Sequence, residues 1–204
     1  MNVKKLILLA ALPLFGVIIF YVFGTNSENY ALTVEAKRKE RIHFLFNSSS
    51  SPLAENKNYK HPGFFDADKK YRVTGKIDIN PKTQIYAVPL SSGQAETYIR
   101  YGDIRFQLEG EEQTLTIFQH LDNRSDYIIP FGDATNGKST YSAGRYIPVN
   151  YNGSEHIVLD FNLAENPYCA FNHNYTCPLP PKENLLSIAI PAGEKHSNSF
   201  MKAE

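Results

Sequence analysis

The sequence predicts a mainly β domain, either an antiparallel sandwich or a partly closed barrel, preceded by an N-terminal transmembrane helix and a short connecting helix. Three observations predict it: an uncharged apolar run at the start, a stretch of helix formers after it, and then about eight short alternating segments. We divide the 204 residues into a membrane anchor or uncleaved signal over 1–24, a linker and juxtamembrane helix over 25–52, and a β domain over 53–204.

The apolar run covers residues 6–23 and follows Lys4 and Lys5. As a helix it would measure roughly 27 Å, close to the hydrocarbon thickness of a bilayer. We therefore expect a single-pass anchor, with a cleaved signal ending near Gly24 as the alternative. The two lysines favour a cytoplasmic N-terminus, whereas the basic cluster over 37–41 argues against it. We expect the domain on the periplasmic or extracellular side.

Residues 31–46 are good helix formers, with Leu32, Ala36 and Lys39 spaced along one side. The serines that precede Pro52 should end this helix.

Beyond it, apolar and polar residues alternate in short segments that Gly, Pro and Asn separate. A hairpin is expected over residues 109–112. We expect strands over residues 71–79, 84–88, 97–108, 114–119, 127–131, 145–149, 156–161 and 185–190.

Two blocks of the sequence carry unusual motifs. The longer one holds Asp160-Phe161-Asn162, Asn166-Pro167-Tyr168-Cys169-Ala170, Cys177 to Pro181, Glu183-Asn184 and Ala192 to Lys195. The shorter one holds Phe131, Asp133, Thr135, Gly137, Thr140-Tyr141 and Gly144-Arg145-Tyr146. Together they closely resemble domain-of-unknown-function family 1684, an uncharacterised bacterial and archaeal family. The resemblance runs from about residue 41 to residue 195, and it implies no known activity.

Polar residues of these blocks are the candidates for a binding pocket. Arg145 offers a planar fork of donors for a carboxylate or phosphate. The candidate ligand-binding residues are Asp133, Tyr141, Arg145, Asp160, Asn162, Asn166 and Asn184. We therefore expect a non-catalytic small-ligand-binding or envelope-associated module. One alternative is a hydrolase that uses Asp, Glu or Cys169; the other is a structural role, in which Arg145 pairs with Asp133 or Asp160 to hold loops together.

Residues 132–139 fit the phosphate-binding pattern G-x-x-x-x-G-K-S. That motif needs a following helix whose N-terminal amides hold the phosphates. Residues 140–146 are poor helix formers and Pro148 follows them, so we predict no nucleotide binding. The formal net charge is zero, with 21 basic and 21 acidic residues, which argues against a nucleic-acid partner.

Cys169, His173 and Cys177 form the pattern C-x3-H-x3-C. In an oxidising compartment we expect a disulfide between Cys169 and Cys177. Free thiols are a second interpretation. A zinc site with His173, completed by His196 or Asp160, is a third, although metal-binding turns usually space their ligands differently. His173 stands outside the family pattern, whereas both cysteines belong to it. We expect no cofactor.

Overall fold

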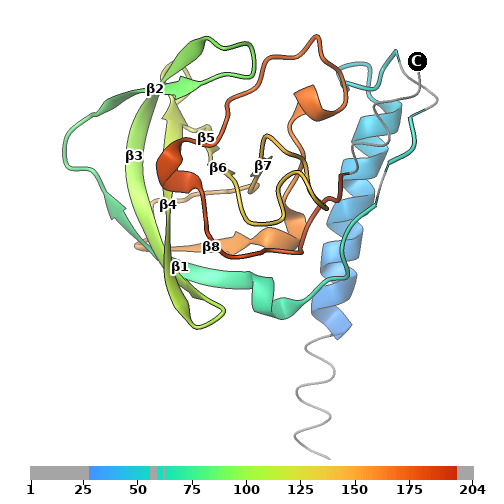
Figure 1. Ribbon diagram of the computed structural model, residues 1–204. Helices are drawn as coiled ribbons and strands as arrows, with labels where there is room; N and C mark the ends of the chain where they lie inside the picture. Colours follow the sequence, from blue (N-terminus) through green and yellow to red (C-terminus); the bar gives the residue numbers. More distant parts are fainter. Residues whose placement is uncertain (1–27, 56–58, 62, 197–204) are drawn as a thin grey trace, which may run out of the picture.

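The computed structural model describes residues 28–55, 59–61 and 63–196. A helix over 28–47 stands beside an antiparallel sheet, and irregular segments lie between them (Figure 1). The strands are β1 (Arg72–Ile79), β2 (Ile85–Pro89), β3 (Ala95–Leu108), β4 (Glu111–His120), β5 (Tyr127–Ile128), β6 (Pro130–Phe131), β7 (Arg145–Tyr146) and β8 (His156–Asp160). The 3-10 helices are η1 (Lys69–Tyr71), η2 (Phe161–Leu163), η3 (Tyr168–Ala170) and η4 (Lys182–Asn184).

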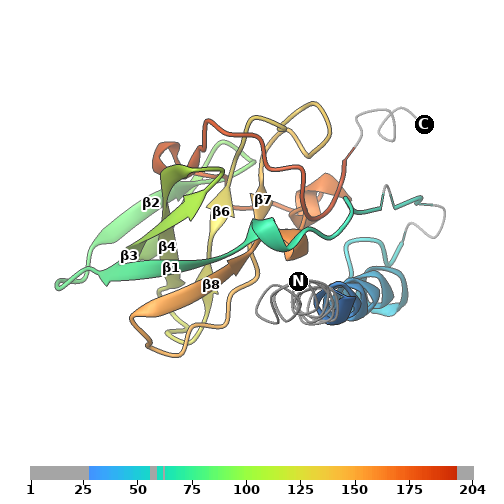
Figure 2. The ribbon, with the colours of Figure 1, turned by 90° about the horizontal axis from the view of Figure 1, so that it is seen from below.

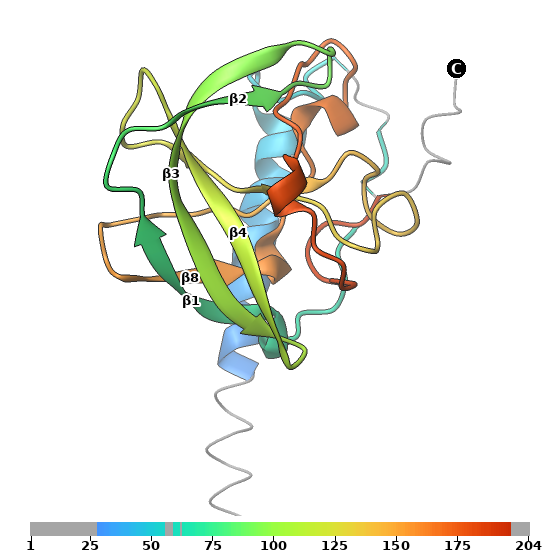
Figure 3. The same cartoon turned by 60° about the vertical axis from the view of Figure 1, so that its left-hand side comes forward.

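The main sheet has six strands in the order β5-β4-β3-β1-β8, with β2 also paired to β3 (Figure 3). The long strand β3 organises it, because its first part pairs with β2 and its later part with β1. A bulge between Arg100 and Gly102 separates these two parts, and bulges of this kind bend a strand and increase its twist. The predicted hairpin joins β3 to β4 through Glu109 and Gly110, whose φ angles of 53° and 82° suit a two-residue turn.

One face of this sheet carries the main hydrophobic core. Strands β1, β3, β4 and β8 contribute alternate residues to it, as the sequence pattern predicted. The opposite wall is built from β6, β7 and the segments around η2 and residues 186–192, which lie between the sheet and the helix (Figure 2). The second layer is therefore mostly irregular chain and not a second large sheet.

Residues 185–190 were predicted to form a strand, and this is wrong. Only Leu185 forms a bridge, to Gly132. The backbone N–H of Ile190 instead donates to Asp133 Oδ1 at 3.2 Å, and its carbonyl accepts from Arg145 Nη2 at 3.0 Å. At Ile190, side chains thus satisfy the peptide groups that a neighbouring strand would have paired, whereas Leu186 and Ile188 pair with the backbone of Gly132 and Ala134.

The helix over 28–47 is present where a helix was predicted, and the side that packs on the domain is not the row of Leu32, Ala36 and Lys39, which is exposed. Leu32 is 58% exposed, whereas Val34 and Leu45 are buried against the domain. Arg38 and Arg41 point the same way and donate to domain carbonyls. Hydrogen bonds from Arg38 and Arg41 to distant segments thus help to decide which face of the helix packs on the domain. The spacing of hydrophobic residues alone does not predict these hydrogen bonds.

The membrane prediction needs correction. The expected span over residues 6–23 lies outside the described residues. Within residues 28–55, 59–61 and 63–196, no helix is long and apolar enough to cross a bilayer. An apolar run can span a membrane only if it forms one continuous helix, which its composition does not establish. The fold is therefore a mainly β antiparallel fold with a docked helix. The single-pass anchor, membrane attachment, the periplasmic or extracellular location and the envelope role have no support in the structure.

Candidate functional site

The first turn of the helix is fixed by two residues that the sequence analysis assigned to a pocket. The Tyr30 hydroxyl donates to Asp160 Oδ1 at 2.9 Å and accepts from Asn162 Nδ2 at 2.8 Å. Asn162 Nδ2 also donates to the carbonyl of Asp68 at 2.8 Å. Burial, followed by the hydrogen bond to Asp160, raises the pKa of Tyr30. This cluster therefore joins the helix to the end of β8.

Two turns later, Arg38 uses its whole guanidinium fork on the backbone. Its Nε and Nη2 donate to the carbonyl of Asn162 at 3.1 and 2.9 Å, and its Nη1 donates to the carbonyl of Phe65 at 2.8 Å. The guanidinium also lies 4.8 Å from the ring centroid of Phe64. These contacts hold the Arg38 side chain in one orientation against the segments that contain Phe65 and Asn162.

Arg41 joins two carboxylates. Its Nε donates to Glu194 Oε1 at 3.0 Å, and its Nη1 lies 3.2 Å from Glu165 Oε2. Its Nη2 donates to the carbonyl of Asn166, whose own N–H donates to Glu194 Oε2 at 2.7 Å. The Glu194 side chain is fully buried, whereas 33% of the Glu165 side chain is exposed. One carboxylate of the cluster is thus closed off and the other is open.

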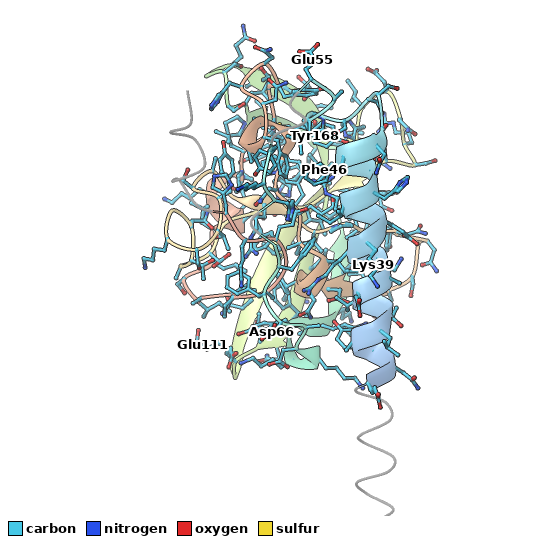
Figure 4. The ribbon with its side chains drawn as sticks, turned by 90° about the vertical axis from the view of Figure 1, so that its right-hand side faces the viewer. Lys39, Phe46, Glu55, Asp66, Glu111 and Tyr168 are labelled. Carbon is cyan, nitrogen blue, oxygen red and sulfur yellow. The ribbon has the colours of Figure 1, made fainter. Side chains whose placement is uncertain are left out.

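Glu165 opens into a groove of about 540 Å³ along the helix. Its apolar walls are Phe44, Phe64, Pro148, Val149 and Leu163, and its polar groups are Lys37, Arg38, Glu40, Arg41, Asn150, Glu165 and Tyr168. A second hollow of about 600 Å³ extends toward Tyr30 and shares Lys37, Pro148, Asn150 and Leu163 with the first. Figure 4 shows Tyr168 beside the helix, where its ring stacks on Phe44 with centroids 6.2 Å apart.

The pKa values of the two carboxylates in the cluster are shifted in opposite directions. Burial raises the pKa of Glu165 to about 7, because Arg41 offsets it only in part and the charge of Glu194 adds to it. Burial also acts to raise the pKa of Glu194, but His61 and Arg41 outweigh it and hold the pKa below its ordinary value. Glu165 can therefore exchange a proton near neutral pH at the edge of the groove.

Arg145, the arginine that the sequence predicted as a ligand-binding residue, lies away from the groove. Arg145 and Asp133 form an ion pair of 2.8 Å in which both side chains are fully buried. Arg145 also donates to the carbonyls of Ile190 and Ala192, while Asp133 Oδ1 accepts from Thr135 N at 2.8 Å. The pairing of Arg145 with Asp133 that the sequence suggested is present. We call this group the Asp133–Arg145 clamp, because it fixes the segment over 190–192 against the turn at residue 133.

Glycines let the signature segments approach each other around this clamp. Gly193 has a φ of 76°, and a Cβ there would lie 2.6 Å from the carbonyl oxygen of Ala164. Gly144 has a φ of 90°, and a Cβ would lie 2.7 Å from the carbonyl oxygen of Phe131. Side chains at either position would be both strained and too close to backbone.

Asn184 and Tyr141 occupy two further places. Asn184 is fully buried and pairs with both backbone groups of Thr116, at 2.7 and 2.9 Å, and with the carbonyl of Pro130 at 2.7 Å. The Asn184 side chain thus pairs with the backbone of β4 at a position where no neighbouring strand does so. The Tyr141 hydroxyl lies 3.9 Å from Cys169 Sγ. The seven predicted ligand-binding residues are therefore spread over several places; of them, Asp160 lines the second hollow, next to the groove.

The phosphate-loop-like segment over 132–139 forms turns, and within the described segment over 140–146 no helix follows it. The amide of Gly132 donates to the carbonyl of Asn184 at 3.0 Å, so it is occupied by protein. The ammonium group of Lys138 donates to the carbonyl of Ala134 at 3.1 Å.

Cys169 and Cys177 are both buried and are free thiols in the structure. The N–H of Cys169 donates to Cys177 Sγ at 3.2 Å, so the two residues lie together. His173, which the zinc interpretation requires, is exposed. Over the described part of the chain, no group of three or more His, Cys, Asp or Glu could hold a metal ion.

Sequence reasoning missed the residues that surround the groove. Glu165 lies inside the longer motif block but has no feature of its own, and the basic residues over 37–41 were considered only as a topology signal. A usable signal was present: Lys37 and Arg41 lie four apart and therefore on one side of the predicted helix.

The chain resembles a solution NMR structure of an uncharacterized protein from Haloarcula marismortui, with 30% sequence identity and a TM-score of 0.65. The match covers 84% of this chain and 96% of that one. No curated protein matches the sequence. Residues 57–195 match the model of the family described as Protein of unknown function (DUF1684), and the chain belongs to that family.

Proposed function

We propose that the domain binds a small organic anion, a carboxylate or phosphate with an apolar portion, in the groove beside the helix. The observation that carries this proposal is Glu165, a carboxyl with a pKa raised to about 7 that faces a groove of about 540 Å³. Sites for small ligands commonly have volumes of roughly 300–1,000 Å³, mostly apolar walls and a few oriented polar groups. A carboxyl with a perturbed pKa in such a place is a functional candidate.

The charges around the groove favour an anion. Three basic residues, Lys37, Arg38 and Arg41, line it against Glu40 and a Glu165 that is half protonated near neutral pH. Arg38 and Arg41 donate to carbonyls and carboxylates of the domain. Lys37 also lines the groove, and none of the ion pairs between described residues involves it, which supports a role for its ammonium group in binding the anion.

The apolar walls define the rest of the ligand. Phe44, Phe64, Val149 and Leu163 all line the groove. A short aliphatic or aromatic body would cover these side chains, which contributes about 25 cal/mol per Å² of buried apolar surface. A fully polar anion would leave them in water and bind more weakly.

Glu165 gives the proposal a pH dependence. When protonated, it can donate a hydrogen bond to the anion; when ionised, it repels the anion. Binding should therefore take up a proton and weaken as pH rises through about 7. A ligand that carries no negative charge and accepts no hydrogen bond from Glu165 would not show this pH dependence.

The test is a thermal-shift screen of the chain with amphipathic carboxylates and phosphate esters, followed by calorimetry on the best ligand. Lys37→Ala should weaken binding about tenfold, because a charge-assisted contact is lost. Lys82→Ala, an exposed lysine in the turn between β1 and β2, is the matched control and should bind normally. Glu165→Gln should bind with the pH dependence removed, and Glu55→Gln is its control. Equal affinity in Lys37→Ala and Lys82→Ala would contradict the groove as the site.

A second candidate function, hydrolysis with Glu165 as general acid or base, rests on the same raised pKa, which suits proton transfer near pH 7. It requires turnover of an ester or phosphate ester that binds in the groove. Loss of turnover in Glu165→Gln, with binding retained, would favour this function over simple binding. Binding without turnover by the unmodified chain would exclude it for that ligand.

A further inference from the structure

The two cysteines form a small site, and neither of them lines the groove. Cys169 lies in η3, and Cys177 Sγ accepts a hydrogen bond from its N–H at 3.2 Å. A disulfide requires Cα atoms about 4.4–6.8 Å apart. Cys177 Sγ already contacts the backbone of Cys169, so the two residues are close neighbours, and we expect closure to need mainly rotation of their side chains.

The surroundings hold both residues in place. Ser91 bonds Cys177 twice: its N–H donates to the Cys177 carbonyl at 2.9 Å, and its Oγ accepts from the Cys177 N–H at 3.0 Å. The Tyr146 hydroxyl donates to the next carbonyl, that of Pro178, at 2.6 Å. The loop that carries Cys177 is therefore fastened on both sides of the cysteine.

The two thiols are not equivalent. A hydrogen bond from the Cys177 thiol is the largest effect that lowers the pKa of Cys169, with burial opposing it and Tyr141 assisting. The same pairing, together with burial, raises the pKa of Cys177. The Tyr141 hydroxyl lies 3.9 Å from Cys169 Sγ, in a position to donate to it. The contact with Tyr141 and the pairing with Cys177 both favour Cys169 as the more acidic thiol of the pair.

We propose that Cys169 and Cys177 are a peroxide-reactive dithiol that closes to a reversible disulfide. The Cys169 thiolate attacks one peroxide oxygen and the O–O bond breaks. The departing hydroxide combines with the proton that the Cys169 thiol released on ionising and leaves as water, and Cys169 becomes a sulfenic acid. The Cys177 sulfur then attacks the Cys169 sulfur. The S–O bond breaks, and the leaving hydroxide takes the Cys177 proton and departs as water. Two electrons pass from the thiols to the peroxide, and a thiol reductant reverses the change.

Burial selects the class of oxidant. Cys169 is 4% exposed and Cys177 is 6% exposed. A bulky disulfide would have to enter the domain to reach either sulfur, whereas hydrogen peroxide is little larger than water. The partner thiol is already in contact, so the sulfenic acid should be captured before it oxidises further. This inference does not depend on the groove ligand or on an oxidising compartment.

The experiment treats the reduced chain with hydrogen peroxide under native conditions, then denatures it and alkylates the remaining thiols. We expect both thiols to disappear together, with a loss of two hydrogen atoms by mass and full recovery after dithiothreitol. Thiols that persist, or oxidation of Cys169 alone to sulfinic acid, would overturn the proposal.

Two variants distinguish the roles. Cys177→Ser should stop at a sulfenic acid that dimedone traps on Cys169, and Cys169→Ser should react about tenfold more slowly than the unmodified chain. Equal rates for the two single-cysteine variants would contradict the assignment of Cys169 as nucleophile. If either variant fails to fold, the pH dependence of iodoacetamide alkylation in the unmodified chain gives the same answer. Peptide mapping should show that Cys169 is alkylated at a lower pH than Cys177. The same pH dependence for both thiols, or alkylation of Cys177 at the lower pH, would contradict the assignment.

Discussion

The chain contains two buried arginine–carboxylate groups that use the same chemistry for different ends. In the Asp133–Arg145 clamp, both side chains are fully buried. In the second group, Arg41 joins the fully buried Glu194 to Glu165, which is 33% exposed. The first group faces only protein, whereas the second has one carboxylate in a groove.

The difference shows how to separate a structural motif from a site. A buried arginine whose two terminal NH2 groups reach backbone carbonyls and one buried carboxylate holds segments together, as Arg145 does for residues 190–192. A carboxyl group that is only partly enclosed, as Glu165 is, can still form a hydrogen bond with a ligand, even though the arginine beside it is already paired with another carboxylate. Motif membership does not make this distinction, because Asp133, Arg145 and Glu194 all belong to the signature blocks.

The largest expected effect comes from breaking the clamp. Arg145→Met leaves the Asp133 carboxylate buried without its partner, and such changes cost about 3–5 kcal/mol of unfolding free energy. Urea denaturation followed by circular dichroism would measure it. The matched control is Arg105→Met, because Arg105 pairs with Asp78 on the surface, where both side chains are about half exposed. That control should cost less than about 1 kcal/mol. Equal losses in the two variants would show that the clamp is not a stabilising element.

A smaller effect should follow when the helix loses its first anchor. Tyr30→Phe removes the hydroxyl that bonds Asp160 and Asn162, which should cost about 1–2 kcal/mol, since one of the two partners is charged. Hydrogen exchange of the helix amides should accelerate more than exchange of the sheet. Tyr86→Phe is the control, because its hydroxyl bonds Glu183 in an exposed position. Unchanged exchange in the helix would contradict the anchoring role of Asp160 and Asn162.

Local pattern predicted much of the fold. Alternation located β1 to β4 and β8, because a strand with one buried face imposes a period of two on its own residues. It failed at residues 185–190, where the backbone pairs with the turn around residues 132–134 and, at Ile190, with the side chains of Asp133 and Arg145. Those contacts join positions about fifty apart, and nothing within the segment itself encodes them.

The candidate site was less predictable for the same reason. Glu165 acquires its raised pKa from burial beside Arg41, and the two residues are far apart in the sequence. The pair Asp133 and Arg145 could be foreseen because both belong to one short block with complementary charges. The proximity of Cys169 and Cys177 could be foreseen from their spacing, but their unequal acidity depends on Tyr141 and on the contact between the sulfurs.

The smallest effect tests the open end of the second group through pH. Because the pKa of Glu165 is raised to about 7, the folded chain binds more protons than the unfolded chain between about pH 4.5 and 7. The contribution of Glu165 to stability is therefore fully present below about pH 4.5 and is lost as pH rises through about 7.

Glu165→Gln cannot ionise, so its stability relative to the unmodified chain should increase from about pH 5 to about pH 8. The change should stay below about 1 kcal/mol, because a partly exposed carboxylate is screened by solvent. Urea denaturation at both pH values measures it, and the same variant at the lower pH is its own reference. If the difference does not grow with pH, Glu165 is ionised throughout this range. The groove would then present a permanent negative charge beside Lys37, and a zwitterionic or cationic ligand would fit it better than the anion proposed above.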